Sequence, residues 1–173
     1  TILRKKLLKG ENMFKALIPN ESYNSIHDID LISLYKKGYR NILIDVDNTI
    51  LPWNSNEISA NLRKWIKQSE VIGFSVFLFS NSSPSRIGKL AQMLNISAIP
   101  KGGKPFSFAF RRALKYIRGN RNNTIMIGDQ IFTDIWGGNL CGLYTILVNP
   151  ISTREFWGTK VNRFLERLLV KRR

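Results

Sequence analysis

Two aspartates separated by one residue, Asp45 and Asp47, follow a short apolar run over residues 41–44. The run predicts a buried strand, and ligands of open α/β sheets bind at the carboxyl ends of such strands. Because two neighbouring carboxylates repel each other, the pair favours a bound cation or a shared proton. Mg²⁺ prefers oxygen ligands and attracts phosphate oxygens, so the pair predicts a site for Mg²⁺ and phosphate. For this segment alone, a solvated turn capped by Asp-Asn-Thr is the alternative.

Three further predicted strands end in polar residues of the kind that a phosphate site needs. Ser80 and Asn81 end a second apolar run and offer a hydroxyl and backbone N–H groups to a phosphoryl oxygen. Lys104 follows the third predicted strand, and Asp129 and Asp134 follow the fourth. Each residue alone is compatible with a helix cap or a surface charge. Four acids, a lysine and a hydroxyl at one sheet edge together predict a phosphate-handling site.

The elements that position these residues alternate along the chain. Strands are predicted at residues 41–44, 73–79, 96–99, 124–127 and 144–148, and helices at 28–37, 58–69, 84–94, 106–118, 133–140 and 152–173. This alternation predicts an α/β fold of three layers, in which helices cover both faces of a mainly parallel, five-stranded sheet. The 173 residues contain no repeat or interdomain linker, so one domain is expected.

The combined pattern resembles the four motifs of the haloacid dehalogenase (HAD) superfamily of phosphohydrolases. The likeness covers roughly residues 42–148 and is carried by Asp45-x-Asp47-x-Thr49, Ser80, Lys104 and Gly128-Asp129-x-x-x-x-Asp134. Within the superfamily the sequence is similar to the YqeG-type members of subfamily IIIA, which include phosphatidylglycerophosphate phosphatases. The resemblance implies a Rossmann-like HAD fold. Lys101-Gly-Gly before Lys104 departs from the usual pattern and leaves open which lysine reaches the site, although the following proline favours Lys104.

The resemblance also implies a role for each acid. Asp45 would be the nucleophile that forms an aspartyl-phosphate, and Asp47 would be the general acid and base. The protein ligands of Mg²⁺ would be the carboxylates of Asp45 and Asp129 and the backbone carbonyl of Asp47. Asp134 would orient Asp129 or Lys104 from outside the metal's ligand shell.

Phosphate binding would fall to residues from three motifs. The implied set is Ser80, Asn81, Thr49 and Lys104, with Lys104 also catalytic through its charge and Thr49 fixing the loop after the nucleophile. Arg86, near Ser80 at the start of a predicted helix, has two interpretations: contact with the phosphate or headgroup, or an ordinary surface position.

The substrate class follows from the spacing of the motifs. Members of the superfamily usually select small molecules with cap domains inserted after the first or second motif. Here a loop, a helix and a strand fill the chain between Asp47 and Ser80, and a helix and a short strand fill that between Ser80 and Lys104, so no cap domain is expected. An open site suits a phosphate presented by a membrane, a polynucleotide, a protein or a partner subunit.

Charge points to an anionic partner. Lysine and arginine number 27 against 12 acids, a net charge of +15 that attracts polyanions. The predicted helix at 152–173 is basic and amphipathic, and either lies on an anionic membrane or packs its apolar face on the domain. Trp53 likewise either contacts an interface or packs against the sheet edge.

The cysteine content, the apolar runs and the first residues of the chain lead to expectations about the compartment, membrane spans and the start of translation. A single cysteine, Cys141, excludes an internal disulfide and fits a reducing compartment, so we expect a cytoplasmic protein. The lipid substrate that the resemblance implies would place it peripherally at the inner face of the membrane. No apolar run approaches the ~18 residues that span a bilayer. Met13 follows Lys9-Gly-Glu-Asn12, which predicts that translation starts at Met13, with residues 1–12 a non-native extension and 13–173 the domain.

The sequence thus predicts a Mg²⁺-dependent phosphomonoesterase, with phosphatidylglycerophosphate as the substrate that the resemblance implies. A polynucleotide or protein phosphatase is the first alternative, because +15 in an open site suits nucleic acid as well. A non-catalytic binding or assembly protein on the same fold is the second. The intact set of Asp45, Asp47, Lys104 and Asp129 argues against it, since a binding protein has no use for all four.

Overall fold

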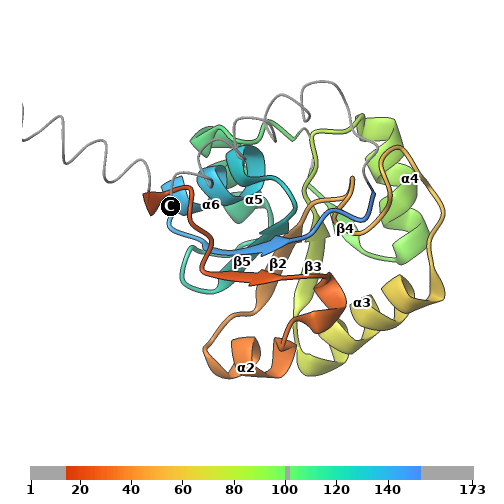
Figure 1. The fold of residues 1–173 in the computed structure, drawn as a ribbon, viewed down its shortest axis with the longest axis horizontal. Helices are drawn as coiled ribbons and strands as arrows, with labels where there is room; N and C mark the ends of the chain where they lie inside the picture. The colour runs from red at the N-terminus through yellow and green to blue at the C-terminus, as the bar shows by residue number, and fades with distance from the viewer. Residues whose placement is uncertain (1–14, 100–101, 153–173) are drawn as a thin grey trace, which may run out of the picture.

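The computed structural model describes residues 15–99 and 102–152. The predictions for residues 1–12 and Lys101, and nearly all of the predicted C-terminal helix, lie outside these ranges. Within them the chain forms one α/β unit of alternating strands and helices (Figure 1).

The centre of the fold is a six-stranded sheet in the order β1-β6-β5-β2-β3-β4, in which every neighbouring pair is parallel. The strands are β1 (Glu21–Tyr23), β2 (Asn41–Ile44), β3 (Ser75–Leu78), β4 (Ser97–Ala98), β5 (Thr124–Gly128) and β6 (Tyr144–Val148). The helices are η1 (Ile26–Asp28), α2 (Leu31–Lys36), α3 (Ala60–Ile72), α4 (Pro84–Leu94), α5 (Ser107–Tyr116), the π-helical turn η2 (Ile131–Ile135) and α6 (Trp136–Leu140).

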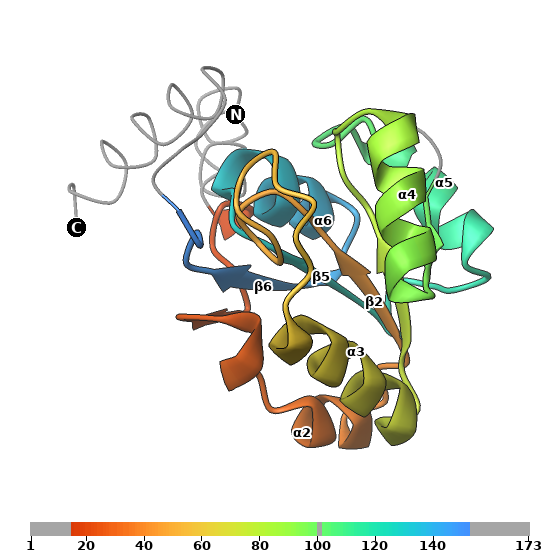
Figure 2. The ribbon, with the colours of Figure 1, turned by 90° about the vertical axis from the view of Figure 1, so that its right-hand side faces the viewer.

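Helices cover both faces of the sheet, which gives the three layers that the sequence predicts. Successive side chains of a strand point to opposite faces, so Ile42 and Ile44 of β2 enter one core and Leu43 enters the other. The first core receives α2, α3 and α4, and the second receives α5. Figure 2 shows α3 below and α6 above the strands β2, β5 and β6. Both faces of the central strands are therefore buried, as their uninterrupted apolar runs require.

The strand order places a topological switch point between β2 and β5. The chain leaves β2 for β3 on one side and returns to β5 on the other. Ile44, the last residue of β2, pairs with Leu78 of β3 and with Ile127 of β5, so the three strands end at the same level. Such a switch point at the carboxyl ends of the strands is where open α/β sheets bind ligands.

The structure corrects the predicted elements in three places. The sheet has a sixth strand, β1, which the sequence analysis missed because Glu21-Ser22-Tyr23 is short, polar and only partly buried at the sheet edge. The helix expected at 28–37 is divided into η1 and α2, because the Asp30 side chain caps a new helix by accepting from Ser33 N–H. The helix expected at 133–140 begins earlier, with the π-helical turn η2.

The expected lack of a cap domain agrees with the connections in the described part of the chain. Between β2 and β3 lie a loop and α3, and between β3 and β4 lies α4. The carboxyl edge of the sheet thus carries loops in place of an inserted domain.

Glu21 joins the edge strand β1 to its neighbours. Its carboxylate accepts hydrogen bonds from Tyr144 Oη at 2.7 Å, Tyr23 Oη at 2.9 Å and Lys37 Nζ at 3.2 Å. Burial raises the pKa of Glu21, but these hydrogen bonds and the Lys37 charge outweigh burial and lower the pKa overall. The ionised carboxylate therefore stabilises the attachment of β1 to β6.

We expect Glu21→Gln to lower the free energy of unfolding by about 1–2 kcal/mol near neutral pH. A carboxyl pKa that is lower in the folded state stabilises the protein above its ordinary value of 4.5. The difference between wild type and variant should therefore be complete above that value and shrink as the pH falls through the folded-state pKa. Urea unfolding across this range measures it. Glu70→Gln, which removes an exposed carboxylate 3.5 Å from Lys67, is the control and should change little. A difference that is independent of pH would contradict the electrostatic origin.

Candidate active site

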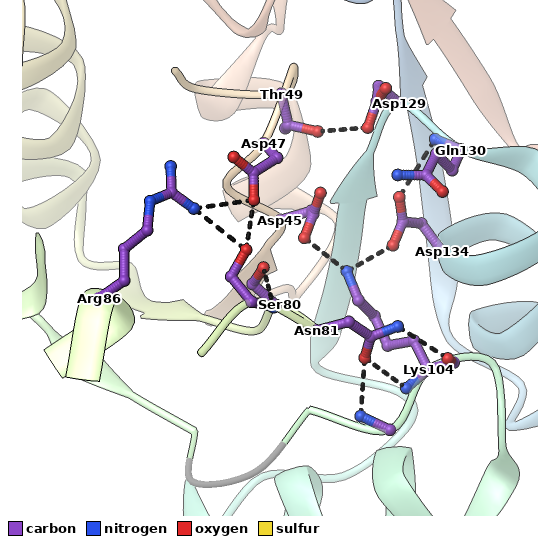
Figure 3. A network of polar contacts seen from close by, with 12 residues as sticks. Asp45, Asp47, Thr49, Ser80, Asn81, Arg86, Lys104, Asp129, Gln130 and Asp134 are labelled. Carbon is purple, nitrogen blue, oxygen red and sulfur yellow. Dashed lines mark hydrogen bonds and ion pairs between the residues drawn. The ribbon is translucent and has the colours of Figure 1, made fainter. Parts of the chain in front are cut away.

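A buried lysine lies between two buried aspartates at the carboxyl edge of the sheet. Lys104 Nζ donates to Asp45 Oδ1 at 2.7 Å and to Asp134 Oδ1 at 2.6 Å (Figure 3). Asp45 follows β2 directly, Asp134 belongs to η2 after β5, and Lys104 comes from the loop between β4 and α5. The side chains of Asp45, Asp134 and Lys104 are 5%, 0% and 2% exposed, so both ion pairs are shielded from water. The structure thus brings together three of the predicted residues from three separate motifs.

Burial and charge set the protonation of this group. Burial raises the pKa of Asp45 to about 6, with the Lys104 ammonium opposing the rise and the Asp134 charge adding to it. Burial also disfavours the ammonium of Lys104, but the charges of Asp134 and Asp45 outweigh burial and raise the pKa of Lys104. Lys104 is therefore a permanent cation at neutral pH, and it favours the ionised form of the Asp45 carboxylate beside it.

The acids of this edge can hold a metal ion. One carboxylate oxygen from each of Asp45, Asp129 and Asp134 lies within 4.8 Å of the others, and all three residues are buried. Three buried carboxylates against the single charge of Lys104 leave an excess of negative charge, which a divalent cation with oxygen ligands would balance. Asp45 and Asp129 are two of the predicted ligands. The cluster contains the carboxylate of Asp134 as well, whereas the predicted contribution of Asp47 is its backbone carbonyl.

Thr49 holds Asp129 in this cluster. Its hydroxyl donates to Asp129 Oδ1 at 3.1 Å, and both residues are buried. This contact joins the loop after β2 to the end of β5 across the switch point. The predicted contact of Thr49 with phosphate stays a prediction.

Asp134 owes its position to a glycine and to the π-helical turn. A Cβ on Gly128 would lie 2.1 Å from Asp134 Oδ2, so only glycine leaves room for this carboxylate at the end of β5. The same oxygen accepts from Gln130 N–H at 3.1 Å, while Oδ1 accepts from Lys104. Such π-helical turns occur frequently at functional sites. Of the two groups that the resemblance implies Asp134 would orient, Lys104 is the one that donates a hydrogen bond to it, and the orienting role stays a prediction.

The amide of Asn81 holds the loop that carries Lys104. Its Oδ1 accepts from Gly103 N–H at 2.7 Å and Lys104 N–H at 2.9 Å, and its Nδ2 donates to the Lys104 carbonyl at 2.9 Å. Gly102 permits the approach, because a Cβ there would lie 2.2 Å from the Ser80 carbonyl oxygen. Ser80 itself is buried at the edge, and its Oγ accepts from Ser82 N–H at 3.2 Å. Phosphate binding by Ser80 and Asn81 stays a prediction.

Asp47 lies apart from the lysine and has its own partners. Its Oδ2 accepts from Arg86 Nη1 at 2.8 Å and from the Ser82 hydroxyl (Figure 3). Its Oδ1 accepts from Asn54 N–H at 3.0 Å. The side chain of Arg86 is 13% exposed, so the surface interpretation of this residue is wrong. Ser82 is not among the residues predicted from the sequence, although its position two residues after Ser80 puts it in the same loop.

The sequence of this chain is similar to those of known proteins. Residues 102–156 match the HAD-hydrolase-like family. The chain is 31% identical over 156 residues to Probable phosphatase YqeG of Bacillus subtilis, with 90% of this chain and 91% of that protein covered. It is 30% identical over 167 residues to Phosphatidylglycerophosphate phosphatase 1, chloroplastic/mitochondrial, of Arabidopsis thaliana, covering 90% of this chain but 48% of the plant protein.

Solved structures share the fold at low sequence identity. One is the cobalt-bound deoxy-D-mannose-octulosonate 8-phosphate phosphatase YrbI of Haemophilus influenzae, with a TM-score of 0.52, 14% identity and coverage of 78% of this chain and 89% of that one. Another is an uncharacterized protein from Listeria monocytogenes, with a TM-score of 0.53, 16% identity and coverage of 76% and 99%. At nearly full length and 31% identity to YqeG, the chain belongs to the YqeG family of the HAD superfamily.

Proposed function

We propose that this protein is a phosphomonoester hydrolase in which Asp45 attacks the phosphorus atom of the substrate. The observation that carries the proposal is the buried Asp45 carboxylate, held at the switch point by the Lys104 ammonium at 2.7 Å. A nucleophile that is positioned in this way splits one difficult displacement into two easier ones.

The chain's own residues supply both halves of the reaction. An Asp45 oxygen forms a bond to phosphorus as the bond to the leaving alkoxide breaks, and Asp47 donates a proton to that alkoxide. Water then attacks the aspartyl-phosphate, Asp47 takes its proton, and phosphate leaves as the Asp45 carboxylate is restored. Lys104 and the hydroxyl of Ser80 stabilise the charge on the transferring phosphoryl group, because both side chains are buried and preorganised.

Mg²⁺ fits the acid cluster, with the carboxylates of Asp45 and Asp129 and the backbone carbonyl of Asp47 as its proposed protein ligands. When bound, the ion would neutralise charge on the phosphoryl oxygens and on the carboxylates that approach them. Lys104 and Asp134 hold Asp45 in place beside it.

A lipid headgroup is the proposed carrier of the phosphate. The plant relative is named a phosphatidylglycerophosphate phosphatase, and loops, with no inserted domain, border the site within the described residues. The net charge of +15 favours an anionic surface. None of the described helices combines the length and apolarity that crossing a bilayer requires. The proposed contact is with the membrane surface, at its cytoplasmic side.

An apolar rim beside the site supports this choice of substrate. The rim consists of Trp53, Phe106, Phe108 and Ile151, which are 40%, 61%, 55% and 51% exposed, respectively. The rings of Phe106 and Phe108 stack with their centroids 5.6 Å apart. Phe106 follows Lys104 by two residues in the sequence. Trp53 N–H donates to Asn48 Oδ1 and Ile151 N–H to the Asn48 carbonyl, which places both beside the residue that follows Asp47. Exposed aromatic side chains next to cationic groups are typical of membrane-interface contacts.

We expect Mg²⁺-dependent release of phosphate from phosphatidylglycerophosphate in mixed vesicles, and its loss in EDTA. Oligonucleotides with 3′- and 5′-phosphates and para-nitrophenyl phosphate are assayed beside the lipid. Hydrolysis of the oligonucleotide ends with the lipid untouched would establish the polynucleotide alternative. Absence of turnover on all three substrates would favour a binding protein.

The rim is tested in the same assay with the double variant F106S/F108S. Turnover of the vesicle substrate should fall by about tenfold or more, since two exposed aromatic side chains that would enter the membrane surface are lost, while para-nitrophenyl phosphate turnover stays unchanged. Tyr116→Ser, which removes a 51% exposed ring at the other end of α5, is the matched control. Equal losses on both substrates would show that the rim supports the site and not the membrane contact.

A further inference from the structure

Arg86 contacts the site through Asp47, and each of its three guanidinium nitrogens donates a hydrogen bond. Nη1 donates to Asp47 Oδ2 at 2.8 Å and to Ser82 Oγ at 3.0 Å. Nη2 donates to the Ser55 carbonyl at 2.8 Å, and Nε donates to Asn56 Oδ1 at 3.2 Å. The Arg86 and Asp47 side chains are only 13% and 16% exposed, so this is a partly buried ion pair and not a surface contact.

These contacts join the start of α4 to two parts of the connection between β2 and α3. Arg86 lies in the first turn of α4, Asp47 follows β2, and Ser55 and Asn56 belong to the loop that leads to α3. The planar guanidinium presents its donors in a rigid fork, so these four hydrogen bonds fix the loop and the Asp47 rotamer together. Asn54 N–H, on the same loop, donates to the other Asp47 oxygen at 3.0 Å.

The two cations of the site form ion pairs with different acids. Within the described residues, the ion pairs of Lys104 are with Asp45 and Asp134, and that of Arg86 is with Asp47. In the proposed reaction, Lys104 therefore acts on the nucleophile and Arg86 acts on the group that transfers protons. In Figure 3, Asp47 and Asp45 lie between Arg86 on one side and Lys104 on the other.

We propose that Arg86 is a positioning residue for Asp47, and that it sets the efficiency of proton transfer to the leaving group. This inference rests on the proposed phosphatase function. A salt bridge that fixes the carboxylate rotamer keeps Asp47 aligned with the leaving oxygen, and loss of Arg86 frees Asp47 to rotate. Ser82 supports the same oxygen and cannot replace the fork, because it has a single hydroxyl.

The inference predicts how the variants depend on the leaving group. A basic alkoxide or phenolate needs a proton as the bond to phosphorus breaks, whereas a weakly basic leaving group departs without one. The value of kcat/KM covers the steps through the first bond cleavage, so it reports on Asp47 as an acid and excludes its later role as a base. Phenyl, para-nitrophenyl and dinitrophenyl phosphate form a series of similar shape and decreasing leaving-group basicity.

We expect Arg86→Met to lower kcat/KM for phenyl phosphate by about 10²-fold and that for dinitrophenyl phosphate by less than about threefold. Asp47→Asn should show the same trend, and R86M/D47N should resemble D47N alone, because the two residues act as a unit. Arg86→Lys keeps a charge but not the fork, so its losses should be intermediate and follow the same order. Lys89→Met removes an exposed cation one turn further along α4 and should leave the series unchanged.

The outcomes separate the inference from the function on which it rests. Equal losses across the series would show that Arg86 binds the transferring phosphate, and would overturn the positioning role. Multiplicative losses in R86M/D47N would overturn it as well. If Arg86→Met fails to fold, as judged by circular dichroism, Arg86→Lys carries the test with the same criteria. Absence of wild-type turnover on every member of the series and on the lipid would instead overturn the proposed function.

Discussion

Asp45→Asn is expected to lower turnover by at least about 10³-fold, because an amide cannot attack phosphorus as a carboxylate does. The substitution nearly preserves the shape of the side chain and leaves Oδ1 able to accept from Lys104 Nζ. Burial of the ionised form is unfavourable, as the pKa of about 6 for Asp45 indicates, so a neutral amide should not destabilise the fold strongly. Phosphate release and thermal unfolding, measured on the same preparations, test both statements.

A trapping experiment makes the assignment to Asp45 specific. Acid quenching of wild type during turnover of labelled substrate should leave phosphate bound to the protein, and Asp45→Asn should leave none. Asp47→Asn is the matched control, since it removes a neighbouring carboxylate while keeping the proposed nucleophile. Retained turnover in Asp45→Asn, or bound label in that variant, would exclude Asp45 as the nucleophile.

Lys104→Met should have the largest effect on stability. It removes the cation between Asp45 and Asp134 from a position that is 5% exposed, and leaves both acids without an opposite charge. Breaking a buried ion pair from one side costs about 3–5 kcal/mol. Turnover should fall by about 10²-fold or more, because the charge that stabilises the transferring phosphoryl group is lost.

Mg²⁺ should distinguish the electrostatic effect from a packing effect. If the loss comes from unbalanced carboxylates, adding Mg²⁺ should recover part of the stability of Lys104→Met by binding the cluster of Asp45, Asp129 and Asp134. Urea unfolding in EDTA and in excess Mg²⁺ measures this recovery. Lys89→Met, which removes an exposed charge, should match wild type in both conditions. A Lys104→Met protein that is as stable as wild type in EDTA would contradict the buried triad.

The sequence alone determined the fold class and the edge of the sheet that carries the site. Uninterrupted apolar runs such as those of β2 and β5 occur where both faces of a strand are buried, and helices between them require parallel pairing. Parallel strands present their carboxyl ends at one edge, so residues that follow strands are brought together whatever their distance in the chain. That rule is enough to predict that Asp45, Lys104 and Asp129 meet.

The tertiary structure alone decided which partner each polar side chain has. Strand β1 pairs with β6 through its edge position and not through an apolar pattern, so local sequence carries little signal for it. The amide of Asn81 turns to the Lys104 loop, and Arg86 turns to Asp47. Long polar side chains have many rotamers and can reach several neighbours, and the choice among them depends on loop positions that close packing sets. Motif spacing therefore predicts where the site lies, whereas the division of its acids between Lys104 and Arg86 appears only once the chain is folded.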